Sequence, residues 1–165
     1  MAESTICKTK RDGTLTILDN GGANSYVISF EAGDLSIDIP GPGVNVFLDR
    51  GALGSTPCLR YGDDQPMSGS FTAHMRDVSD ATDVSLIEFL AESGQVASTF
   101  VSTLGANAEV RTYTLRWDIE GTDHGDAADH RIECNFCAIS GSVGEGDPNT
   151  VNISFTSYDL YPTVT

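Results

Sequence analysis

Lysine and long apolar runs are both scarce in this sequence. Its two lysines lie within the first eleven residues. No apolar run approaches the roughly 20 residues that a membrane-spanning helix needs, so we expect no membrane association. The N-terminal residues also lack the apolar core of a signal peptide, and we therefore expect the chain to fold in a cytoplasm.

Positive charge is almost absent beyond the N-terminus. Lys8, Lys10 and Arg11 form a basic segment over residues 1–11, whereas residues 12–165 hold six arginines against twenty-three acidic residues. The net charge is −15, and such a surface repels nucleic acid because phosphate contacts require Lys and Arg. The charge serves solubility or salt adaptation, or it forms a surface past which DNA moves without binding. Length and a hydrophobic content of 39% predict one domain over 12–165.

The four cysteines do not form a recognisable redox or zinc pattern. Cys134 and Cys137 match C-x-x-C, but they lie in a strand-like run, where residues i and i+3 point to opposite faces. A redox motif would instead begin a helix, and zinc would need a second pair of ligands. With Cys7 and Cys58, they are predicted to be free thiols, and buried ones are favoured.

Alternation of polar and apolar residues predicts seven or eight strands. The dipeptide Asn20-Gly21 predicts a tight hairpin between the first two. The fold class is therefore mainly β: a β-sandwich or half-open barrel with one flanking α-helix. The expected strands cover residues 14–19, 26–30, 35–39, 67–75, 96–104, 110–119, 132–138 and 151–156.

A single helix is predicted over about 82–93, where apolar residues recur at helical spacing. Asp80, Thr82 and Asp83 are candidate N-caps, and Gly94 suits the C-terminal end. Ser85, Glu88 and Glu92 would form its polar face.

The residue patterns of common enzymes are missing, so we expect no catalysis and no cofactor. No Gly-x-Ser-x-Gly nucleophile motif and no Gly-rich phosphate loop are present. One acidic turn could bind Ca²⁺, although its spacing does not match an EF-hand, and the alternative is an ordinary exposed turn. Its residues are Asp118, Glu120, Asp123, His124, Asp126, Asp129 and His130.

Residues 40–66 form a connection of unusual length for a domain of this size. Such connections are usually functional or disordered, and this one is too apolar for a solvated linker. We expect it to pack on a neighbouring subunit. The residues predicted to make that contact are Val44, Val46, Phe47, Leu48, Arg50, Leu53, Leu59 and Arg60.

Six short segments of the sequence carry a likeness to a known family: residues 12–17, 30–35, 48–51, 60–66, 101–105 and 145–150. In their order, and together with the single helix and the long connection, they resemble the tail tube (major tail) proteins of long-tailed bacteriophages. The likeness covers about residues 12–160, and the four cysteines are not part of it.

The resemblance implies a structural virion protein of the phage tail, assembled in the host cytoplasm. Six subunits would close a ring around a continuous inner β-barrel, with strands near 24–39, 67–75, 109–119 and 130–140. Rings would stack into a tube whose acidic lumen conducts DNA during ejection. Partners would be other copies of the chain and the tail tip, tape-measure and terminator proteins. The implied lumen-facing acids are Glu31, Asp34, Asp38, Glu109, Asp118 and Glu133.

Two other classes of function stay open at this point. A β-sandwich with acidic turns could bind carbohydrate or Ca²⁺, with Tyr158 and Tyr161 stacking on sugars. A capsid decoration or head–tail joining protein would share the virion context but differ in symmetry. Metal-dependent stabilisation would distinguish the first alternative, and imaging would distinguish the second.

Overall fold

The computed structural model describes residues 13–19, 24–28, 34–49, 56–76, 78, 84–96 and 110–165. Within these ranges the chain is mainly β with one α-helix, as the sequence predicted. The elements in chain order are β1 (Gly13–Asp19), β2 (Ser25–Ile28), β3 (Ser36–Asp38), β4 (Val44–Asp49), β5 (Thr56–Tyr61), β6 (Met67–His74), α1 (Leu86–Ala91), the 3₁₀ turn η1 (Gly94–Val96), β7 (Tyr113–Ile119), the 3₁₀ turn η2 (Thr122–His124), β8 (His130–Gly144), β9 (Thr150–Ser157) and β10 (Thr163–Val164).

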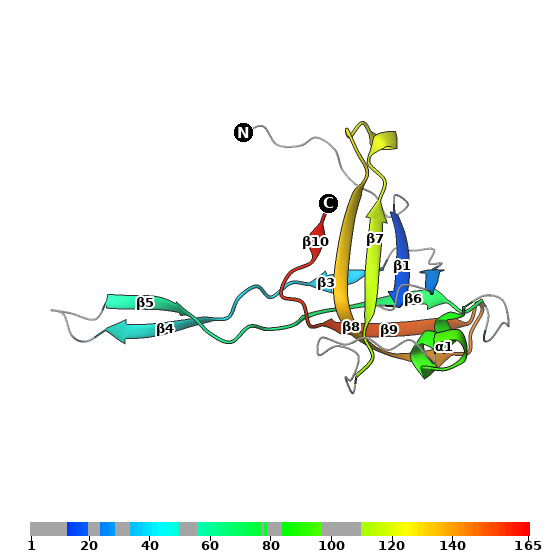
Figure 1. Cartoon of the computed structure of the whole chain (residues 1–165), viewed down its shortest axis with the longest axis horizontal. Coiled ribbons are helices and arrows are strands. Elements are labelled where there is room, and N and C mark those ends of the chain that lie inside the picture. Colours follow the sequence, from blue (N-terminus) through cyan, green and yellow to red (C-terminus); the bar gives the residue numbers. More distant parts are fainter. Residues whose placement is uncertain are drawn as a thin grey trace.

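The main sheet has the strand order β2-β1-β7-β8-β9-β6-β3, with β10 paired to β8. The 15-residue β8 pairs with β7 along its first half and with β9 along its second half. The sheet therefore folds over at β8, and β1 and β7 cross the direction of β9 and β6 (Figure 1). The architecture is sandwich-like rather than a closed barrel.

A β-bulge in β8 marks the point where the sheet folds. Tyr113 of β7 pairs with Cys137, whereas Leu115 pairs with Cys134, so β8 carries one extra residue between them. Within that stretch Phe136 has a positive φ of 51°. A bulge bends its strand and increases the local twist, which allows one strand to serve both halves of the sheet.

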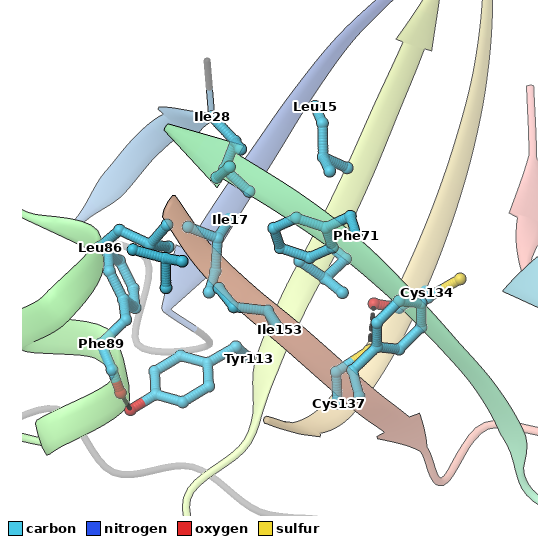
Figure 2. Close-up of a cluster of buried hydrophobic side chains, with 14 of the residues drawn as sticks. Leu15, Ile17, Ile28, Phe71, Leu86, Phe89, Tyr113, Cys134, Cys137 and Ile153 are labelled. Atoms are coloured by element: carbon cyan, nitrogen blue, oxygen red, sulfur yellow. Dashed lines mark hydrogen bonds between the residues drawn. The ribbon is translucent and has the colours of Figure 1, made fainter. Parts of the chain in front are cut away.

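The hydrophobic core fills the space between the two halves of the sheet (Figure 2). The predicted alternation places Leu15 and Ile17 of β1 in this core, opposite Phe71 of β6 and Ile153 of β9. The buried apolar residues are Leu15, Ile17, Ile28, Met67, Phe71, Ala73, Leu86, Phe89, Val96, Tyr113, Leu115, Cys134, Cys137, Val151, Ile153 and Phe155.

Helix α1 is shorter than predicted and begins at a different cap. Ser85 is the N-cap: its Oγ accepts a hydrogen bond from the Glu88 backbone at 3.2 Å, and the Glu88 carboxylate accepts one from the Ser85 backbone at 3.0 Å. This is a capping box. Ser85 and Glu88 are therefore buried, and the expectation that they form a polar exposed face was wrong. The candidate caps Asp80, Thr82 and Asp83 lie outside the described residues.

Helix α1 packs on the core through its aromatic residue. The Phe89 and Tyr113 rings meet edge to face with centroids 5.3 Å apart, and the Tyr113 hydroxyl donates to the Phe89 carbonyl at 3.2 Å. Burial raises the pKa of Tyr113 to about 12. Among the described residues, no helix has the length and apolar character needed to cross a membrane.

Strands β2 and β3 follow one another in the chain but lie at opposite edges of the sheet. β2 pairs with β1 as a hairpin, but Leu18 is opposite Ser25, which is not the register of a two-residue turn at Asn20-Gly21. β3 pairs with β6. The two strands expected over 26–30 and 35–39 thus correspond to β2 and β3 in the described residues. The connection between them links the two edges of the folded sheet.

Candidate interaction surfaces

The long connection contains a two-stranded ribbon that projects from the body of the domain (Figure 1). Strands β4 and β5 pair antiparallel from Val44–Tyr61 to Asp49–Thr56 and form a separate sheet. We call these two strands the arm. The sequence predicted a long connection at this place but not its strands. The connection does not fold back on its own domain.

One face of the arm is apolar and open to solvent. Val44 is opposite Tyr61 and Val46 is opposite Leu59, and directly paired side chains lie on the same face of a ribbon. Their exposed fractions are 56% for Val44, 64% for Val46, 72% for Leu59 and 85% for Tyr61. Contiguous exposed apolar patches are uncommon on monomers and usually mark interaction sites. The apolar face of the arm is therefore a candidate interaction surface.

The structure places most of the predicted contact residues on the arm. Val44, Val46 and Leu59 lie on the apolar face, and Arg60 is exposed, opposite Asn45 in the ribbon. Phe47 and Leu48 also belong to β4, but only the backbone of these two residues is described. Arg50 and Leu53 lie outside the described residues. Sequence analysis missed Tyr61, although its position across the ribbon from Val44 follows from the pairing of the strands.

The base of the arm is closely packed. The Gly62 amide donates to the Gly43 carbonyl at 2.7 Å. A Cβ atom at Gly43 would overlap the backbone carbonyl oxygen of Asp63. The two segments that lead into and out of the arm can therefore approach here only because residue 43 is glycine. Pro40 and Pro42 restrict the backbone of the entering chain. These contacts hold the two segments of the arm together at its base.

A second surface is the outward face of the folded sheet, where two of the predicted lumen acids are held in ion pairs. Asp118 of β7 is opposite Arg131 of β8, and their side chains are 2.6 Å apart. Glu133 is opposite Arg116 at 3.2 Å. The hydrogen bond to Asp118 raises the pKa of Arg131 further. This part of the face is close to neutral rather than strongly acidic.

Two more of the predicted lumen-facing acids, Asp34 and Asp38, lie beside β6. The carboxylate of Asp34 accepts hydrogen bonds from the Thr72 amide, with both oxygens 3.1 Å away. Asp38 is opposite Ser68 at the edge of the sheet and is exposed. The remaining two, Glu31 and Glu109, lie outside the described residues.

Small hydroxylated side chains dominate the outward face of β6, β9 and the second half of β8. Ser140 and Ser154 are within hydrogen-bond distance at 3.2 Å, and Thr72 donates to Asn152 at 2.9 Å. These residues surround an open depression of about 500 Å³. The lining residues are Asp34, Ser70, Phe71, Thr72, Ser140, Gly141, Ser142, Asn152, Ile153 and Ser154. The depression can offer hydrogen bonds but lacks a basic side chain.

The acidic turn uses its carboxylates to hold its own backbone. Asp129 accepts from the amides of Gly121 at 3.0 Å and Thr122 at 3.1 Å, and these bonds lower its pKa. Asp126 contacts His130 at 2.9 Å. Within the described residues, no three His, Cys, Asp or Glu side chains are placed to hold a metal ion.

Cys134 and Cys137 are both buried free thiols, although simple alternation predicted opposite faces. The bulge at Phe136 adds a residue and returns Cys137 to the core side. The Cys137 thiol donates to the Cys134 carbonyl at 3.2 Å. Burial is the main cause that raises the pKa of Cys134 to about 11 and of Cys137 to about 12. Such thiols are unreactive at neutral pH.

Comparison with known proteins gives a fold relationship. No family model matches the sequence, and no curated protein matches it significantly. Among solved structures, the chain is similar to a chain of the anti-feeding prophage baseplate, determined by cryo-EM with six-fold symmetrisation. The TM-score is 0.55 at 11% identity, and the alignment covers 100% of this chain and 97% of the other. The two chains therefore share a fold over their whole length.

Proposed function

We propose that this chain is a structural subunit of a phage-type tail, which closes hexameric rings and stacks them into the tail tube. The observation that carries the proposal is the projecting arm, whose apolar face is exposed in the part of the chain that the structure describes. The fold likeness to a baseplate chain of a six-fold symmetrised particle supports it. Catalysis is not part of this role.

The electrostatic character of the chain fits a conduit for DNA. The net charge of −15 opposes lasting contact with phosphates. Arg116 and Arg131 of the sheet's outward face are each bound to a carboxylate, and the neighbouring surface is rich in hydroxyl groups. A tube lined by such a face would let DNA slide through. The tail tip, tape-measure and terminator proteins would be the partners at its ends.

The test is assembly of the purified full-length chain, followed by light scattering and negative-stain microscopy. The wild type is expected to form six-subunit rings or hollow tubes as concentration rises. A chain that stays monomeric at high concentration, even with tail-tip assemblies added as seeds, contradicts the proposal. Rings with another symmetry would instead favour a decoration or joining protein.

A pair of matched variants tests the part played by the arm. Val46→Asp and Asn45→Asp each add one negative charge to β4, but only Val46 lies on the apolar face. We expect V46D to stay monomeric and N45D to assemble.

A deletion variant tests the arm as a whole. A two-residue Asn-Gly turn can replace residues 44–61, because Gly43 and Gly62 are hydrogen bonded at the base. This variant should fold but not stack; if it forms ordinary tubes, the arm has no role in assembly.

A further inference from the structure

Exposed apolar side chains also recur over a short stretch near the C-terminus. Tyr158, Leu160, Tyr161 and Val164 fall within seven residues and have exposed fractions between 41% and 66%. We call these four residues the C-terminal patch. Of the exposed large apolar residues outside the arm, the others are separated along the chain, at positions 27, 39, 78, 110 and 143.

The backbone of the C-terminal patch is fixed to β8 at both ends. The Tyr158 amide donates to the Phe136 carbonyl at 3.2 Å. At the other end, Thr165 and Arg131 exchange two backbone hydrogen bonds of 3.0 and 2.7 Å, and β10 continues this pairing along β8. A surface held in this way loses little conformational freedom when it binds a partner.

We propose that the apolar face of the arm of one copy lies on the C-terminal patch of a neighbouring copy. This inference rests on the proposed function and names the receiving surface for the arm. Among the arm residues whose side chains are described, the four apolar ones share one face and Asn45 and Arg60 lie on the other, so the apolar face can lie on a single surface. In Figure 1 the arm extends away from the body that carries its own β10. In this proposal the C-terminal patch that the arm contacts therefore belongs to a second copy.

The sizes of the two surfaces match. With four large apolar side chains on each, both present roughly 400–500 Å² of exposed apolar area. Their sum is close to the lower limit of about 1,000 Å² for a specific interface, before backbone and polar atoms are counted. Each surface also offers tyrosine, which is enriched in the energetically dominant centres of interfaces.

Charge favours the same contact. Two copies of a chain with a net charge of −15 repel each other, so they should meet where carboxylates are few. The eight side chains of the two surfaces are uncharged. Since the arm and the patch are different surfaces, the contact is heterologous and repeats from copy to copy.

Photo-crosslinking of the full chain tests this contact. Benzoylphenylalanine replaces Tyr61 on the apolar face in one sample and Asn45 on the opposite face in the control. Mixing isotope-labelled and unlabelled copies identifies adducts between copies by mass spectrometry. We expect position 61 to give an inter-copy adduct within residues 158–164, and position 45 to give much less. An adduct elsewhere, an adduct within one copy, or no adduct overturns the inference.

A second variant separates this inference from the proposed function. Tyr158→Ser with Tyr161→Ser should raise the concentration needed for assembly about tenfold or more, as expected for loss of an interface centre. Circular dichroism of the monomer checks that the fold is kept. Assembly at the wild-type concentration would overturn the receiving surface while tubes in the micrographs would still support the proposed function. An adduct at the C-terminal patch without tubes would support the receiving surface and contradict the proposed function.

Discussion

Alkaline pH should destabilise the domain through the two thiols beside the bulge. The pKa of Cys134 is raised to about 11 and that of Cys137 to about 12, from an ordinary value near 9, mainly because both are buried. In the folded state both thiols stay largely protonated between pH 9 and 10. In the unfolded state they ionise, so unfolding releases protons and its free energy falls as pH rises. The stability that they contribute is fully present below pH 9.

The magnitude follows from the shifts. One pH unit above the unfolded pKa, each thiol removes about 1.4 kcal/mol, so both together remove about 3 kcal/mol at pH 10. This is a large part of the roughly 5–15 kcal/mol that stabilises a typical domain. Tyr113 adds little at pH 10, because its effect begins near its own ordinary value of 10.

Urea unfolding at pH 7, 8, 9 and 10 measures the effect, with the single tryptophan, Trp117, as the fluorescent reporter. The control is the double variant Cys134→Ala with Cys137→Ala, which should be less stable at pH 7 but nearly insensitive between pH 8 and 10. If the variant loses as much stability with pH as the wild type, other groups cause the effect. Rapid alkylation of either thiol in the folded protein at pH 8 would also refute the reasoning.

Three further substitutions test the base of the arm, the N-cap of α1 and one ion pair on the sheet. Gly43→Ala should place a methyl group against the Asp63 carbonyl and displace the arm, so light scattering should detect less assembly while the melting temperature of the domain barely changes. Ser85→Ala removes the N-cap of α1 and should reduce the free energy of unfolding in urea by about 1–2 kcal/mol. Asp118→Asn breaks a half-exposed pair with Arg131 and should change that free energy by less than about 1 kcal/mol; a larger loss would mean that the pair is more important than its exposure indicates.

Sequence periodicity was sufficient to predict the strands that have one buried face. In β1 and β9 every second residue is buried, and the expected boundaries were close to those observed. The existence of α1 was also predictable from the spacing of its apolar residues. Its start was not predicted, because several polar residues precede it and each could act as the N-cap. The signal that marks the true N-cap is Glu88, three positions after Ser85 and inside the helix.

The arm and the bulge were not predictable in the same way. Residues 44–46 alternate as a strand should, but Phe47 breaks the alternation, and Pro and Gly on both sides favoured a loop. The bulge has no glycine at its left-handed position, which is occupied by Phe136. The positions of Cys134 and Cys137 therefore depended on tertiary pairing between β7 and β8, which a single sequence does not reveal.

An exposed apolar ribbon is a liability unless its direction is controlled. A flexible ribbon with the side chains of Val44, Val46, Leu59 and Tyr61 would bind any apolar surface and lead to disordered aggregation. Here the glycine-dependent contact holds the two strands together at the base, and the flanking prolines restrict the backbone that leads into the ribbon. In the proposed assembly, each copy would offer its apolar face to the next copy, and the repulsion between acidic bodies would disfavour other contacts. The same exposed side chains can thus direct an ordered polymer instead of an aggregate.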